Sequence, residues 1–173
     1  GPAISYGTEY EADQSYQDAA FGVAVDGEGG IYVCGAIERP ASKLINRWVR
    51  KYSAQNGSAL WTKEINWEDG TNSLDYAKAC AVDPGGRVIV AGSSDHDSLG
   101  QELDMVVEHY ECGDGFLVRS IGYDSDYPVS LNQQNFCTTP HDESGEGVAV
   151  YPDGGYVVVG WEDRTCLNQG YNW

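Results

Sequence analysis

One hairpin pattern occurs three times in this chain of 173 residues. Residues 25–35, 82–92 and 150–160 each run from a short apolar stretch through a turn into a β-branched and aromatic stretch that ends in glycine. The fifth position of each copy is a glycine, and a turn of this kind between two apolar stretches is typical of a β-hairpin. The copies start 57 and then 68 residues apart. We therefore expect a repeat architecture.

Each of the first two hairpins is followed by two more stretches with strand character. Residues 46–52 and 104–110 are apolar and aromatic, and Gly57 and Gly115 then mark turns before residues 59–67 and 116–123. Each unit is therefore predicted to be four antiparallel strands joined by hairpins. The second stretch of each hairpin is continuously apolar where a half-exposed strand would alternate, which indicates that both faces of the sheet are covered.

Repeated four-stranded units of this length predict an all-β protein made of β-propeller blades, about two and a half of which are present. Residues 1–17 are expected to form the last strand of a preceding blade and a connecting loop. Residues 18–74 form a complete blade, residues 75–142 a complete blade with a long exit loop, and residues 143–173 the first half of a further blade. These residues could not close a ring alone, so we expect further blades from a longer chain or from partner subunits.

A resemblance to a known family supports this prediction. Residues 18–35 read acidic-x-Ala-x-Gly-Val-Ala-Val-Asp followed by a glycine turn and Ile-Tyr-Val-x-Gly, and residues 75–92 are similar. This pattern resembles the bacterial extracellular β-propeller repeats of the SBBP type, and Gly57 and Trp61 match the tail of that repeat. The third copy departs from the pattern at Glu143 and Tyr151. The resemblance implies a propeller and says little about activity.

The charge of the chain excludes some partners. It has 27 acidic and 10 basic residues, a formal net charge of −17, and a field of this sign repels nucleic-acid phosphates and anionic membranes. No apolar stretch approaches the ~20 residues that span a bilayer. We therefore expect neither nucleic-acid binding nor a membrane span. The uncovered blade faces and strand edges instead predict self-association or binding to another protein.

The five cysteines lack the C-x-x-C spacing of a zinc or redox site. With an acidic surface and a single methionine, they favour an exported protein, extracellular or at the cell surface of a bacterium. Two pairs are disulfide candidates, Cys137 with Cys166 and Cys34 with Cys80, although a small buried thiol explains either pair as well. Cys112 is left over.

The candidate site residues lie at loops and strand ends. Variable loops on a rigid scaffold often carry binding sites, which singles out Trp161, Tyr171, Asp95 and His96. Oxygen-rich loops also bind calcium, with solvated loop charge as the alternative, and the candidate ligands are Asp95, Asp97 and Asp142. The acidic residue that opens each unit is predicted to accept backbone hydrogen bonds at a blade junction, and these residues are Asp18, Asp75 and Glu143.

No spacing of residues matches a known catalytic constellation. The sequence therefore favours an exported, non-enzymatic structural or protein-interaction module, with calcium possible and no other cofactor expected. Two alternatives stay open. One is part of a propeller enzyme, either quinoprotein-like or polysaccharide-cleaving, and the other is a carbohydrate-binding, lectin-like propeller.

Overall fold

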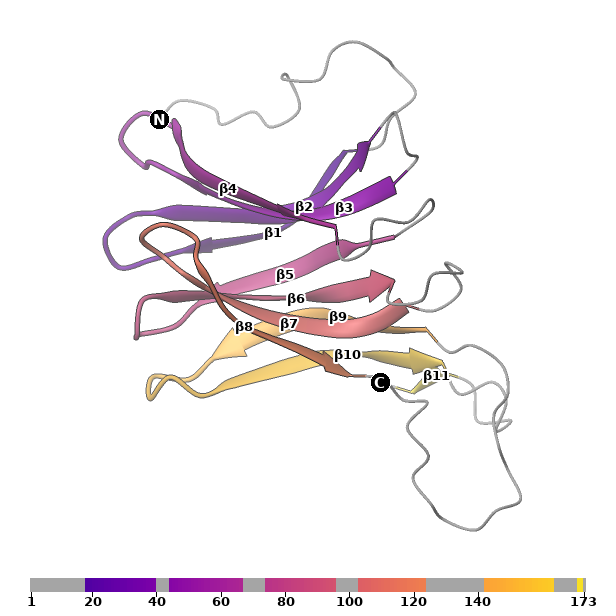
Figure 1. Cartoon of the computed structure of the whole chain (residues 1–173). Helices are drawn as coiled ribbons and strands as arrows, with labels where there is room; N and C mark the ends of the chain where they lie inside the picture. The colour runs from indigo at the N-terminus through magenta and orange to yellow at the C-terminus, as the bar shows by residue number, and fades with distance from the viewer. Residues whose placement is uncertain are drawn as a thin grey trace, which may run out of the picture.

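The protein consists of three antiparallel β-sheets stacked face to face (Figure 1). The computed structural model describes residues 18–39, 44–66, 74–95, 103–123, 142–163 and 171–172, and within these ranges every regular element is a strand. The predicted all-β class and the four-stranded antiparallel sheets are therefore confirmed. No helix in the described part is long and apolar enough to cross a bilayer.

The strands follow the chain in order across each sheet. The first sheet comprises β1 (Ala19–Val25), β2 (Ile31–Arg39), β3 (Leu44–Tyr52) and β4 (Ala59–Ile65). The second comprises β5 (Tyr76–Val82), β6 (Arg87–Asp95), β7 (Leu103–Glu111) and β8 (Leu117–Tyr123). The third contains β9 (Glu143–Val150), β10 (Tyr156–Asp163) and β11 (Tyr171–Asn172), with β10 in the middle.

The glycines that the sequence places in turns all adopt a left-handed conformation. Their φ angles lie between 71° and 89° at Gly29, Gly57, Gly86, Gly115 and Gly154. A side chain is strained at such angles, whereas glycine adopts them readily. These five residues therefore set the hairpin turns, as predicted.

The glycine that closes each hairpin pattern has a different role. Gly35, Gly92 and Gly160 lie opposite an irregular register in the neighbouring first strand of their sheet. A Cβ atom at Gly92 would lie 1.9 Å from the carbonyl oxygen of Tyr76, and equivalent contacts of 1.9 Å occur at the other two glycines. The backbones approach too closely for any side chain, so the repeated glycine maintains the β-bulge.

We expect Gly92→Ala to lower the free energy of unfolding by about 3 kcal/mol, because the new methyl group must displace a backbone carbonyl. Urea denaturation followed by circular dichroism measures this loss. Gly113→Ala is the control, since a Cβ there meets nothing within 4 Å, and its effect should stay within about 0.5 kcal/mol. Equal effects of the two substitutions would contradict the role assigned to the bulge.

The sheets pack through their first strands. β5 contacts β1, β2 and β3, and β9 contacts β5, β6 and β7. A hydrophobic core between the first two sheets includes Tyr32, Cys34 and Val49 on one side and Val88 and Tyr110 on the other. Gly22 lies at the contact between β1 and β5, where a Cβ would be only 3.0 Å from the Ala79 Cα atom. Small residues on the first strands therefore let the sheets approach closely.

Strand β6 of the second sheet is covered on both faces, as its apolar run predicts, whereas β8 at the edge of that sheet is largely exposed. β6 is buried from Val88 to Asp95. The first and third sheets each turn one face away from the second sheet. We call these the leading face, with Val23, Val25, Ile31 and Val33 of the first sheet, and the trailing face, with Gly147, Ala149, Val157 and Val159 of the third.

Candidate functional site

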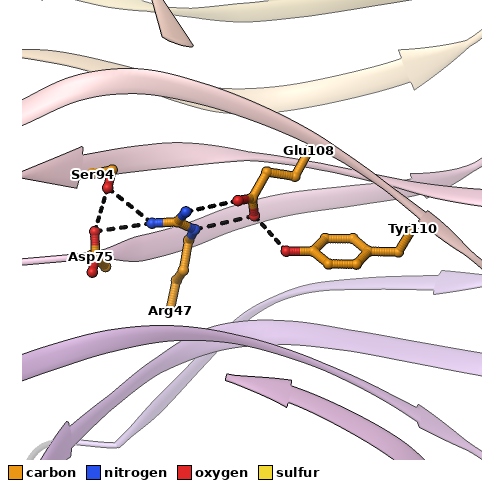
Figure 2. Close-up of polar contacts among 5 residues, drawn as sticks. All are labelled: Arg47, Asp75, Ser94, Glu108 and Tyr110. Carbon is orange, nitrogen blue, oxygen red and sulfur yellow. Dashed lines mark hydrogen bonds and ion pairs between the residues drawn. The ribbon is translucent and has the colours of Figure 1, made fainter. Parts of the chain in front are cut away.

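The most extensive polar cluster in the described part of the chain is an ion network between the first two sheets (Figure 2). Its centre is Arg47 of β3, whose side chain is only 1% exposed. Nε and Nη2 donate to the two carboxylate oxygens of Glu108 in β7, at 3.1 and 2.7 Å. Two parallel bonds of this kind match the planar guanidinium to the planar carboxylate, which makes this a strong and directional pair.

The remaining nitrogen of Arg47 bonds to the strands that precede β7. Nη1 donates to Asp75 Oδ1 and to Ser94 Oγ, both at 2.9 Å. The Ser94 hydroxyl in turn donates to Asp75, and the Tyr110 hydroxyl donates to Glu108 at 2.6 Å. We refer to these five residues as the inter-sheet ion network. It joins one strand of the first sheet to three segments of the second.

Burial and charge act in opposite directions in this network. Burial alone would lower the pKa of Arg47, but the adjacent Glu108 and Asp75 carboxylates hold it above its usual value. The pKa of Tyr110 is raised, first by burial and then by the neighbouring Glu108. Arg47 therefore remains a cation and Tyr110 a neutral donor at every physiological pH.

We expect Arg47→Met to lower the free energy of unfolding by about 3–5 kcal/mol, because it leaves two carboxylates buried without their cation. Chemical denaturation measures the loss. Arg50→Met in the same strand is the matched control: Arg50 bonds to Thr62 on the opposite face of the first sheet, and its loss should cost less than about 1 kcal/mol.

The triple variant Arg47→Met, Asp75→Asn, Glu108→Gln should recover much of the stability lost in Arg47→Met, because it removes the unpaired charges as well. A triple variant as unstable as the single one would show that the network acts through packing alone.

A second polar contact joins the same two sheets near the hairpin turns. The carbonyl oxygen of Cys112 accepts hydrogen bonds from Lys51 Nζ at 2.9 Å and from Trp61 Nε1 at 3.1 Å. Trp61 is the tryptophan of the repeat pattern, and its ring also lies 5.9 Å from that of Tyr32. The recurrent aromatic position is therefore used here for packing between sheets.

The junction between the second and third sheets has different chemistry. Met105 occupies the position of Arg47, and Glu143 and Glu162 occupy those of Asp75 and Ser94. A cavity of about 200 Å³ lies there, lined in part by these three residues together with Tyr123 and Trp161. At the same junction, the His109 ring of β7 packs edge-on against Tyr156 of β10, with ring centroids 5.0 Å apart. Burial, followed by the positive charge of Arg119, lowers the pKa of His109.

The predicted junction carboxylates do not share one environment. Asp75 and Glu143 are buried, whereas Asp18 is exposed and accepts a 3.2 Å hydrogen bond from the backbone nitrogen of Glu38. Asp75 instead receives the Arg47 guanidinium and the Ser94 hydroxyl. The expected backbone contact is thus present at Asp18, while Asp75 accepts hydrogen bonds from the side chains of Arg47 in β3 and Ser94 in β6.

The predicted binding residues are spread over several elements. Asp95 is buried at the end of β6, and Trp161 in β10 donates to Glu146 at 3.1 Å. Tyr171 pairs with Asp163 at the start of β11. Asp142 accepts a 3.1 Å hydrogen bond from the backbone nitrogen of Leu103. His96, Asp97, Cys137 and Cys166 lie outside the described residues.

Calcium binding stays a prediction. Within the described ranges no three side chains of His, Cys, Asp or Glu gather in a way that could hold a metal ion. Asp142 already bonds to the start of β7, as described above, and the Asp142 carbonyl accepts from the Asp163 backbone nitrogen at 2.9 Å. These contacts give Asp142 a role in joining the second and third sheets.

Cys34 and Cys80 meet between β2 and β5, as the sequence suggested. Both are buried free thiols. A hydrogen bond with Cys80, together with burial, raises the pKa of Cys34 far above its usual value. The thiolate that attacks in disulfide exchange is therefore scarce in the folded protein, and the disulfide stays a prediction.

If these thiols can be oxidised together, treatment with oxidised glutathione should remove two hydrogens from the protein and join the Cys34 and Cys80 peptides, as peptide mass spectrometry would show. We expect the reaction to be slow in the native protein and faster at low urea concentrations, because the thiols must become exposed to ionise. Cys112→Ala should leave the product unchanged, whereas Cys34→Ser should abolish it. A Cys34–Cys112 product instead would contradict the pairing.

The sequence did not single out Arg47, Glu108 or Ser94. Arg47 shares its strand with Arg50 and Lys51, and Glu108 shares its strand with Asp104 and Glu111, so no local pattern distinguished the two buried charges from the others. No protein-family model matches the chain, and no curated protein sequence matches it either. The likeness to SBBP-type repeats therefore stays a prediction.

Proposed function

We propose that this chain is an exported, non-enzymatic structural or protein-interaction module. Its four-stranded sheets are blades of a β-propeller, and further blades cover the leading and trailing faces. The observation that carries this proposal is the exposure of apolar residues on those two faces at positions that are covered in the second sheet.

On the leading face, Val23 and Val25 are 66% and 62% exposed. By register these residues correspond to Cys80 and Val82 in β5. Cys80 is buried, and both Cys80 and Val82 pack into the core between the first two sheets. The same surface is thus covered by a neighbouring sheet in one repeat and open in the other.

The trailing face shows the same contrast. Val157 and Val159 of β10 are 43% and 61% exposed. Their counterparts in β6, Ile89 and Ala91, are fully buried. Complete burial of a valine contributes about 1.5–3 kcal/mol relative to exposure, so covering the four exposed valines would stabilise an assembly substantially.

The ionisable groups of the described core support a structural role. Arg47, Asp75 and Glu108 bond to one another and to Ser94 and Tyr110, an arrangement that holds strands in place. The strongly acidic composition and the predicted family likeness support export, in which case the surface charge keeps the module soluble outside the cell.

The test compares the protein purified from its natural source with isolated residues 1–173 by hydroxyl-radical footprinting and peptide mass spectrometry. We expect the peptides with Val23, Val25, Val157 and Val159 to be modified in the isolated chain and protected in the natural assembly.

The exposed side chain of Phe116, just before β8 of the second sheet and so outside both faces, serves as the control and should be modified equally in the two samples. Equal modification of the four valines in both samples would overturn the proposal.

A further inference from the structure

We infer that the partner of the leading face is a second copy of this chain, which presents its trailing face. This inference rests on the proposed function and adds the identity of the partner. Three observations support it: the two faces are of complementary kinds, the leading face requires no cation from its partner, and the chain already contains two examples of the same contact.

The two internal contacts define what fits each face. The first sheet covers the second with the face that carries Tyr32 and Cys34. The covered face of the second sheet carries Cys80, Val88 and Val90. By register, the leading face of the first sheet corresponds to the covered face of the second sheet. The trailing face of the third sheet corresponds to the face with which the first sheet covers the second. A trailing face therefore has the right shape to pack on a leading face.

The charges on the leading face differ from those at the internal junction. The covered face of the second sheet has Asp75, Ser94 and Glu108, two negative charges that Arg47 of the covering sheet partly neutralises. The corresponding residues of the leading face are Asp18, Ile37 and Arg50. Their formal charges sum to zero, so the covering sheet need not supply a cation there.

The third sheet meets this requirement. The described residues of the third sheet, 142–163 and 171–172, include no lysine or arginine, so this sheet brings no cation to the junction.

Such a contact joins two different faces, so it is heterologous and would build rings or open chains from identical copies. Each copy carries a formal charge of −17. The copies therefore repel one another at long range, and the apolar contact must overcome this repulsion. Association should accordingly strengthen as salt screens the charge.

The test measures solution mass by analytical ultracentrifugation on residues 1–173 and two variants, Val23→Asp on the leading face and Val159→Asp on the trailing face. Both side chains are exposed, so circular dichroism should show both variants folded. We expect the wild type to form species heavier than the 18.8 kDa chain, with association at least tenfold weaker in each variant alone.

The equimolar mixture of the two variants is decisive. Each variant keeps the face that the other has lost, so the mixture should form dimers and nothing larger. Val118→Asp, on the exposed strand β8, is the control and should associate like the wild type.

Three results would overturn the inference: a monomeric wild type, a mixture without dimers, or association that weakens as salt is raised. If the inference fails while the four valines are still protected in the natural assembly, another polypeptide covers the faces and the proposed function stands. If that protection is absent as well, both fail.

Discussion

A single buried guanidinium determines how the first two sheets sit against each other. Arg47 bonds to Asp75, Ser94 and Glu108 on three separate segments of the second sheet. Taking these charges out of water costs several kcal/mol per ion, and the cost is recovered only when the hydrogen-bond geometry is good. These hydrogen bonds are directional, so a shift of one sheet over the other would break several of them at once.

The repeat and the network together explain why the junctions are not interchangeable. The backbone elements that build each sheet recur, including the turn glycines and the bulge opposite Gly35, Gly92 and Gly160. The polar residues between sheets do not recur: Arg47 at the first junction becomes Met105 at the second. Recurrent backbone features give each sheet the same shape, and variable buried charges give each contact its own partner. Mismatched charges at such contacts are an efficient way to exclude wrong pairings.

The elements of the fold were predictable because their causes are local. A glycine at the fifth position of a hairpin pattern requires only its own φ angle, and Gly29, Gly86 and Gly154 were assigned correctly. The continuous apolar run of β6 likewise indicated cover on both faces. The ion network was not predictable, because its bonds join residues 28, 47 and 61 positions apart. Asp75 was placed at a sheet junction from its recurrence, but its partners depend on how sheets stack, which no local pattern contains.

In the described part of the chain, the leading and trailing faces lack the neighbouring sheet that covers each face of β6 in the middle sheet. A repeat protein stabilises each unit largely through its neighbours, so the two terminal units need either a polar outer surface or a further neighbour. The exposed valines of the leading face lie in β1 and those of the trailing face lie in β10, at positions whose counterparts in the middle sheet are covered. Capping by polar residues is therefore not the solution used on these faces. The exposed valines instead fit the proposed arrangement, in which a further sheet covers each face.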